Sequence, residues 1–236
     1  MKLKLLDSMR IARNKEELDL WPHVNDLPPE TPGRWTAKDQ LAHLTAWRVI
    51  AASEVDMVST AGAAGAGPRN FDAENSRIYE EAREQPAFLI LDAATTSWER
   101  LALSIEACSD EVLARPRLRR PEEQLWQDIC IMYHHLMEHL VYWQLDRGDE
   151  AAAEGAASWG YELAERMFPA DSQRGVAAYN VGCIYALRGR AGAAMRHLRA
   201  GLRLRPDLRD WAKRDPDLDS IRSSPELQAL LGELQN

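Results

Sequence analysis

Two histidines spaced four residues apart are the feature of this sequence best suited to chemistry. His135 and His139 lie in a segment that reads as a helix, where this spacing places both side chains on one face, about a turn apart. Two ligands of one metal ion need that arrangement. The same face carries apolar residues, and imidazoles that face an apolar core are costly to bury unless each has a partner. A metal ion is one such partner, so the pair predicts a metal site.

A third histidine extends this hypothesis to a three-histidine site. His43 belongs to a separate predicted helix, on the same side as Gln40 and Trp47. If the two helices are neighbours, His43 completes a set of three ligands that leaves one coordination position open for water or substrate, as in catalytic metal sites. The metal would be zinc, nickel or iron(II). His23, at the end of the first predicted helix, is expected to cap that helix or to face water, and His197 is expected to face water.

Aromatic residues beside the histidines are candidates for the wall of a substrate pocket. Trp47 follows His43 by about one helical turn, and Tyr142 and Trp143 follow His139 on the later helix. Aromatic side chains at helical spacing also build ordinary protein cores, which is the alternative interpretation for each of the three.

The later histidine pair also fits a different zinc motif. Residues 135–139 read H-x-x-E-H, a reversed zinc-peptidase pattern in which the glutamate is the base. That chemistry needs a further ligand, usually acidic, whereas His43 would supply an imidazole. Glu138 lies about 100° round the helix from the adjacent histidine, so an exposed charge or a salt bridge is the favoured interpretation for it.

Long helices must position these residues. Apolar residues recur at helical spacing in four long segments and one short one. The predicted ranges are 3–24, Thr36 onward, 73–84 (the short helix), 86–107 and 121–147. Thr36 and Asp39 resemble a capping box at the start of the second long helix. No segment alternates apolar and polar residues as a strand would, so the predicted fold class is all-α, with a four-helix bundle over residues 1–148.

Residues 149–236 differ from this bundle. A helix is predicted at 150–167, and residues 175–208 read as two short helices around a turn at Gly189. That unit is 34 residues long and resembles a tetratricopeptide repeat. Small residues let its paired helices approach, namely Gly182, Ala194 and Gly201. A lone repeat cannot bury its apolar faces, so we expect the tail to dock on the bundle or on another subunit.

The bundle segment resembles a known family. Residues 33–47 run from Gly33-Arg34-Trp35-Thr36 through Asp39 to His43-Leu44 and Trp47, and His135-x-x-x-His139 follows on the last bundle helix. In these motifs residues 1–148 resemble DinB-like (DinB/YfiT-type) proteins. The resemblance implies a four-helix bundle that holds a metal on three histidines. It also implies a homodimer and a small-molecule substrate.

Two functional hypotheses from different classes follow. The resemblance implies a metal-dependent enzyme for thiol transfer, isomerisation or hydrolysis of a reactive electrophile, because characterised relatives include transferases and isomerases that use a low-molecular-weight thiol. Others protect cells from reactive small molecules, which implies a detoxification or resistance role. The alternative is a non-catalytic adaptor whose repeat-containing tail recruits a protein partner.

The composition and charge of the whole chain argue against a disordered, a nucleic-acid-binding and a membrane-spanning protein. Of 236 residues, 45% are apolar and 28% are charged, which is typical of a globular protein. Residues 1–150 hold 17 Lys and Arg against 26 Asp and Glu, which argues against a nucleic-acid-binding surface there. No apolar run approaches the roughly 20 residues that a bilayer requires, and the charged N-terminus is unlike a signal peptide. Three widely spaced cysteines fit a reducing compartment, so a cytoplasmic location is expected.

Overall fold

The computed structural model describes residues 1–27, 34–61, 70–116, 124–167 and 171–232. In these residues it contains eleven α-helices, three short 3-10 helices and no strand, which confirms the all-α fold class. None of the described helices is both long enough and apolar enough to cross a bilayer. The chain divides into two compact units, Met1–His139 and Leu140–Asn236, and the division falls within helix α6 (Leu125–Asp146).

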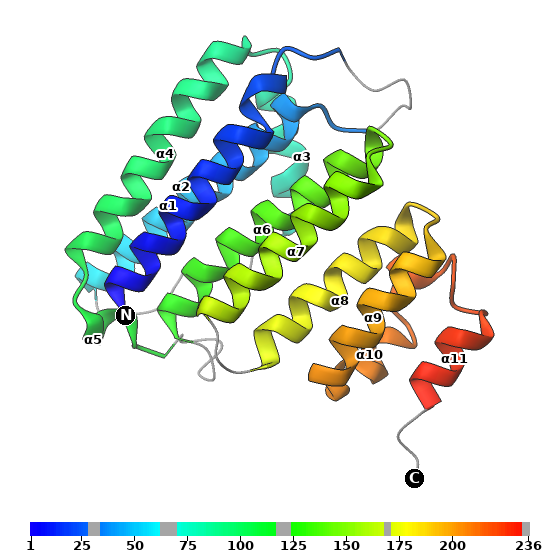
Figure 1. The fold of residues 1–236 in the computed structure, drawn as a ribbon. Coiled ribbons are helices and arrows are strands. Elements are labelled where there is room, and N and C mark those ends of the chain that lie inside the picture. The colour runs from blue at the N-terminus through cyan, green and yellow to red at the C-terminus, as the bar shows by residue number, and fades with distance from the viewer. Residues whose placement is uncertain (28–33, 62–69, 117–123, 168–170, 233–236) are drawn as a thin grey trace. The chain divides into compact units, whose positions relative to one another are not determined.

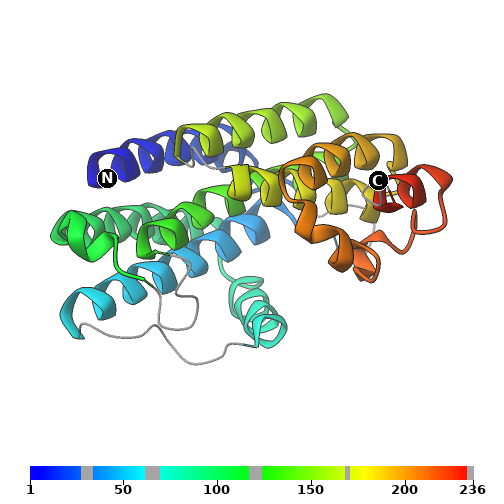
Figure 2. The same cartoon turned by 90° about the horizontal axis from the view of Figure 1, so that it is seen from below.

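The first unit is built from long helices packed side by side (Figure 1). They are α1 (Lys2–Asp19), α2 (Ala37–Ala61), α4 (Ala87–Ala107) and the first part of α6. The short helix α3 (Phe71–Ala82) lies beside α2, on the side away from α1 (Figure 2). A single turn, α5 (Asp110–Leu113), follows α4 and was not predicted. The predicted start of the last long helix at residue 121 lies outside the described residues.

The first helix is shorter than its apolar pattern predicts. The range 3–24 is divided into α1, which ends at Asp19, and a 3-10 turn, Trp21–His23. Pro22 lies at the start of that turn. Because proline has no backbone N–H to donate, it cannot continue the α-helical hydrogen-bond pattern.

The capping box that begins α2 is confirmed. The backbone N–H of Thr36 donates to Oδ2 of Asp39 at 2.9 Å, and the backbone N–H of Asp39 donates to Oγ1 of Thr36 at 3.1 Å. Two backbone donors that a helix start leaves unpaired are thereby satisfied. This fixes where α2 begins, and His43 follows about two turns later.

A buried polar network joins α1, α2 and α4. Glu16 of α1 and Arg48 of α2 are 0% and 3% exposed, and two N–O contacts of 2.5 and 3.1 Å connect them. Arg48 Nε also donates to Ser97 Oγ at 2.9 Å, and Trp98 Nε1 donates to Glu16 Oε1 at 2.9 Å. Both charges are therefore paired and hydrogen-bonded, which makes their burial tolerable. The network was not predicted from the sequence.

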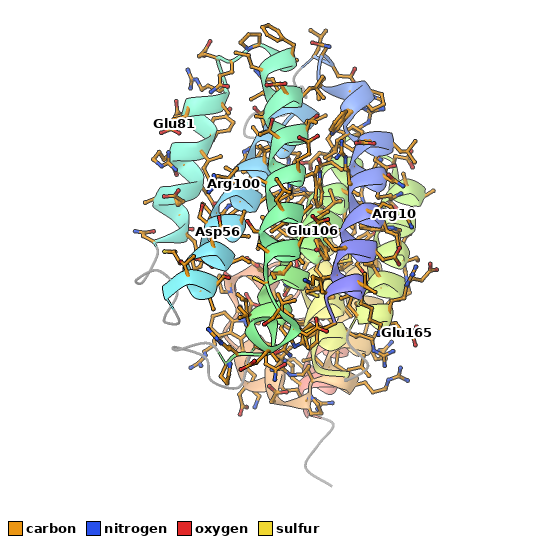
Figure 3. The ribbon with its side chains drawn as sticks, turned by 90° about the vertical axis from the view of Figure 1, so that its left-hand side faces the viewer. Arg10, Asp56, Glu81, Arg100, Glu106 and Glu165 are labelled. Atoms are coloured by element: carbon orange, nitrogen blue, oxygen red, sulfur yellow. The ribbon has the colours of Figure 1, made fainter. Side chains whose placement is uncertain are left out.

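The outer face of the same helices carries solvent-exposed charged side chains. Figure 3 labels several of them, including Arg10, Arg100 and Glu106. Arg100 of α4 donates to Ser53 Oγ at 3.0 Å and lies 3.9 Å from a carboxylate oxygen of Asp56, with both charged side chains about half exposed. Exposed pairs of this kind contribute little to stability.

The second unit contains the helices predicted for the tail. They are α7 (Glu150–Met167), α8 (Asp171–Leu187) and α9 (Ala191–Leu204), and Figure 1 shows α8 and α9 as a hairpin. Gly189 makes the turn with a φ of +71°, a left-handed conformation that favours glycine.

Small residues allow α8 and α9 to approach closely, as the repeat pattern predicts. A Cβ added at Gly182 would lie 2.7 Å from Cγ of Leu198, and one added at Gly201 would lie 2.7 Å from the backbone N of Tyr179. Real Cβ atoms do not approach other atoms this closely, so these positions require glycine.

The segment after α9 packs back onto this hairpin. It contains α10 (Arg209–Ala212), α11 (Pro225–Gly232) and two 3-10 turns. Asp215 is only 4% exposed and accepts from the hydroxyl of Tyr179 at 2.6 Å, from Nε1 of Trp211 at 2.9 Å and from the backbone N of Asp217 at 3.1 Å. Part of the surface that a lone repeat leaves open is thus covered by the chain's own C-terminal segment.

The prediction that His197 faces water is wrong. Its side chain is buried, its ring stacks on that of Tyr185 with centroids 5.1 Å apart, and its Nδ1 lies 2.8 Å from the hydroxyl of Tyr161. The reason is helical register: His197 is three residues after Ala194 and four before Gly201, both on the buried side of α9. The arginines beside it had suggested an exposed segment.

Replacing the buried arginine tests the polar network. Arg48→Met leaves the carboxylate of Glu16 buried without its partner, so we expect the free energy of unfolding to fall by about 3–5 kcal/mol. Urea denaturation followed by circular dichroism measures the change. Arg100→Met is the matched control, for which we expect less than about 1 kcal/mol. Equal losses in the two variants would contradict the structural role given to Arg48.

A pair of glycine substitutions tests the close helix approach. Gly201→Ala places a methyl group against backbone atoms, so we expect a loss of about 1–3 kcal/mol in unfolding free energy. Gly155→Ala in α7 is the control, because a Cβ there meets nothing within 4 Å. In that exposed helical position alanine should stabilise by up to about 1 kcal/mol. In thermal denaturation we therefore expect the melting temperature to fall in Gly201→Ala and to rise in Gly155→Ala. A Gly201→Ala variant as stable as the wild type would contradict the close approach of the two helices.

Candidate metal site

Three imidazole nitrogens converge in the first unit. Nε2 of His135 lies 3.2 Å from Nε2 of His43 and 2.9 Å from Nε2 of His139. The three ligand atoms all lie within 4.8 Å of one another. The predicted ligand residues are therefore brought together from two helices that are distant in the sequence, and this cluster could hold a metal ion.

Local sequence explains how the side chains reach this point. On α2, the side chains of Gln40, His43 and Trp47 recur at positions i, i+3 and i+7, which form one face of a helix. On α6, His135 and His139 are one turn apart and therefore share a face. Each helix thus presents its histidines in one direction, and the cluster forms where the two faces meet.

Burial keeps the three imidazoles neutral. It lowers the pKa of His43 to about 4 and is the main cause that lowers the pKa of His135 to about 3, with smaller effects from the nearby charges of His43 and Arg48. The pKa of His139 is also lowered well below its usual value, first by burial and then by the two other histidines. Neutral imidazole is the form that binds a metal ion.

Hydrogen bonds among the histidines cannot satisfy all three Nε2 atoms. Nδ1 of His139 donates to Oε1 of Gln40, so a neutral His139 has an unprotonated Nε2 that can only accept. His135 Nε2 must then donate to it, and its single N–H leaves nothing to share with His43. Protons alone therefore leave the contact between Nε2 of His43 and Nε2 of His135 without a hydrogen bond of its own, whereas one cation at the centre would bind the lone pairs of all three nitrogens. The donor set therefore fits a metal ion.

Gln40 holds one of the ligands in position. Its side chain is 3% exposed and accepts from Nδ1–H of His139, which fixes the ring orientation and directs Nε2 toward the other two histidines. A partner on the second ring nitrogen is the usual support for a metal-binding histidine. His43 lacks that support, because its Nδ1 is buried and has no hydrogen-bond partner among the described residues.

Two tryptophans lie against the cluster. The ring of Trp35 stacks on that of His139, with centroids 5.9 Å apart and planes 14° apart, and it lies 5.1 Å from the ring of His43. Trp47 lies 6.2 Å from the ring of His43. The two indoles therefore give the cluster an apolar boundary, which helps to explain the lowered histidine pKa values.

Helix α3 holds these tryptophans through one of its faces. Phe71, Asn75 and Tyr79 recur every four residues, so they share that face. Asn75 Oδ1 accepts from Nε1 of Trp47 at 3.1 Å, the ring of Phe71 lies 5.6 Å from that of Trp47, and Tyr79 stacks on Trp35 at 5.9 Å. The short helix is thus a second layer behind the aromatic boundary.

The three predicted pocket residues are divided between the two units. Trp47 lies beside His43, as expected. Tyr142 and Trp143 belong to the second unit, where the guanidinium of Arg188 lies 4.7 Å from the ring of Tyr142 and that of Arg147 lies 4.6 Å from the ring of Trp143. A role for any of the three in binding substrate stays a prediction.

The ligand atoms that meet at this point favour a three-histidine metal site over a zinc-peptidase site. Among the residues that the structure describes, the ligand atoms that meet there are three imidazoles and no carboxylate. A peptidase of the H-x-x-E-H type would need an acidic ligand beside His135 and His139.

Several residues around the cluster were not assigned a role from the sequence. Gln40 precedes His43 by three residues and so faces the same way, but its contact with His139 depends on how α2 and α6 pack. The spacing of Phe71, Asn75 and Tyr79 was visible as a helical face, yet nothing in the sequence indicates which helix that face meets.

Comparisons with family models, with curated proteins and with solved structures find no match to this chain.

Removing the amide of Gln40 tests its support of His139. We expect Gln40→Ala to weaken binding of Zn²⁺ by about 10- to 100-fold, because the ring of His139 loses the partner that fixes its orientation. Competition with a chromophoric chelator measures the affinity. Gln85→Ala is the matched control, since the side-chain amide of Gln85 donates to the backbone carbonyl of Glu81, at the end of α3. An unchanged affinity in Gln40→Ala would show that His139 needs no such partner.

Proposed function

We propose that this protein is a metal-dependent enzyme that acts on a small molecule at the cluster of His43, His135 and His139. The observation that carries the proposal is the convergence of three neutral imidazole nitrogens on one point. Structural zinc sites are usually closed by four protein ligands, whereas catalytic sites have three and keep a position open. Three ligands from the described residues meet here, which supports the catalytic type.

The donor set suggests which ions suit the site. Imidazole ligands suit zinc, nickel and iron(II). Such an ion, when bound, polarises a substrate group or lowers the pKa of a bound thiol or water. His43, His135 and His139 would hold it, and Gln40 would keep His139 in the binding orientation. Trp35 and Trp47 would limit access of water and offer apolar contacts to a small substrate.

The proposed reaction class rests on the resemblance to DinB-like proteins in residues 33–47 and 135–139. It is thiol transfer, isomerisation or hydrolysis of a reactive electrophile, with a low-molecular-weight thiol as the second reactant where thiol is transferred. Detoxification or resistance is the corresponding biological role, and a homodimer is the corresponding assembly. The aromatic boundary supports this class, because reactive electrophiles are often partly apolar.

Metal content and thiol consumption together test the proposal. We expect about one transition-metal ion per chain by elemental analysis of the tag-free protein, and we expect His43→Ala to lose it while its helical circular dichroism is retained. The metal-loaded protein should accelerate consumption of a low-molecular-weight thiol by a reactive aryl halide, and the chelated protein and the His43→Ala variant should not.

His23→Ala is the control for the histidine substitution. His23 is partly exposed and lies 2.8 Å from Asp26, so its loss should change neither metal content nor rate. Absence of metal from the wild-type protein, even after reconstitution, would overturn the catalytic-metal proposal. A bound metal without any thiol-dependent or hydrolytic activity would overturn the reaction class and leave only a metal-binding protein.

A further inference from the structure

A series of stacked rings connects helix α3 to one of the three candidate metal ligands. The ring of Trp35 stacks on that of His139 with planes 14° apart, and it stacks on that of Tyr79 with planes 11° apart. The ring centroids are 5.9 Å apart in both pairs, a distance typical of offset aromatic stacking. Tyr79 of α3 is therefore joined through one indole to His139 of α6.

Trp35, the middle ring of this series, has no helix to hold it. It lies in residues 34–36, a stretch before α2 that belongs to no helix. Because helical hydrogen bonds do not hold this residue, the direction of its indole depends on the rings that it packs against. The indole also lies 5.1 Å from the ring of His43, so it contacts one ligand on each of the two helices. A displaced Trp35 would remove packing from both ligands.

The end of α3 that carries Tyr79 is fixed to the first unit by other contacts. Nζ of Lys38, in the first turn of α2, donates to the backbone carbonyls of Arg83 at 2.7 Å and Gln85 at 3.0 Å. Ala82 is buried in a cluster with apolar residues of α2 and α4. Tyr79 precedes Ala82 by only three residues, so its ring is a firm support for Trp35.

The other end of α3 is held less firmly. The buried residues of α3 begin at Ile78. Before that point, Asn75 accepts a hydrogen bond from Nε1 of Trp47, and the ring of Phe71, which is 58% exposed, lies 5.6 Å from that of Trp47. Trp47 in turn lies against the ring of His43. The position of the first turns of α3 thus depends on a tryptophan that also contacts a metal ligand.

These contacts connect the ordering of α3 with the ordering of the ligand rings. Rings that α3 already holds in place lose less freedom when an ion binds, and rings that an ion holds give α3 a fixed surface. We propose, as an extension that rests on the proposed function, that α3 is a positioning element of the metal site. Tyr79 acts through Trp35 on His139, and metal binding and the docking of α3 strengthen each other by the same factor.

Cobalt(II) bound to the full-length protein tests the role of Tyr79. We expect Tyr79→Ala to weaken Co²⁺ binding by about 2- to 10-fold, the effect of losing one aromatic pair. The visible absorption bands of bound Co²⁺ should also change, because the ring of His139 is no longer held in one orientation. Tyr79→Phe should restore the wild-type affinity and spectrum, since stacking needs the ring and not the hydroxyl.

Phe88→Ala is the matched control for the loss of an aromatic ring. Phe88 lies in the first turn of α4 and is 67% exposed, so its removal should change neither the affinity nor the spectrum. Wild-type affinity and spectrum in Tyr79→Ala, or equal effects of Tyr79→Ala and Phe88→Ala, would overturn the positioning role.

Hydrogen exchange of the wild-type protein tests the reverse effect without any substitution. Saturating Zn²⁺ should slow amide exchange in residues 74–82 of α3 by about 2- to 10-fold, whereas exchange in α9 of the second unit should stay the same. Equal exchange in α3 with and without bound Zn²⁺ would overturn the coupling and leave the proposed function intact. A wild-type protein that binds neither Zn²⁺ nor Co²⁺ would overturn both.

Discussion

The ion pair between Glu16 and Arg48 is the constraint on which the first unit depends. Two charges removed from water are stable only when their hydrogen bonds are complete, so α1, α2 and α4 must meet in one arrangement. Arg48 follows His43 by five residues on α2, so a rotation of that helix would move both side chains. The pair therefore fixes the direction in which His43 points as well as the packing of three helices.

The histidine cluster is a second buried polar group in the first unit, and its hydrogen bonds are not complete. Nδ1 of His139 is paired with Gln40, whereas Nδ1 of His43 is buried and has no hydrogen-bond partner among the described residues. The first unit thus stabilises its core with a complete polar network and accepts an incomplete one a short distance away. Incomplete hydrogen bonding in a native structure is expected where a ligand completes it.

Much of this arrangement could be predicted from the sequence, because it depends on local patterns. Helical spacing placed His135 and His139 on one face, and Thr36 with Asp39 marked the start of α2. The buried partnership of Glu16 with Arg48 could not be predicted, because each residue alone resembles a surface charge. His197 was placed wrongly for a related reason: neighbouring arginines describe the exposed face of α9, whereas burial is decided by the face that meets Tyr185.

One consequence of the donor set concerns its electric charge. The three ligands are neutral, and the group that supports His139 is an amide, where many metal sites have a carboxylate. A divalent ion held by this set would keep both of its positive charges. The remaining coordination position would therefore favour an anion, such as thiolate or hydroxide, over a neutral ligand, because no neighbouring carboxylate among the ligands offsets the ion.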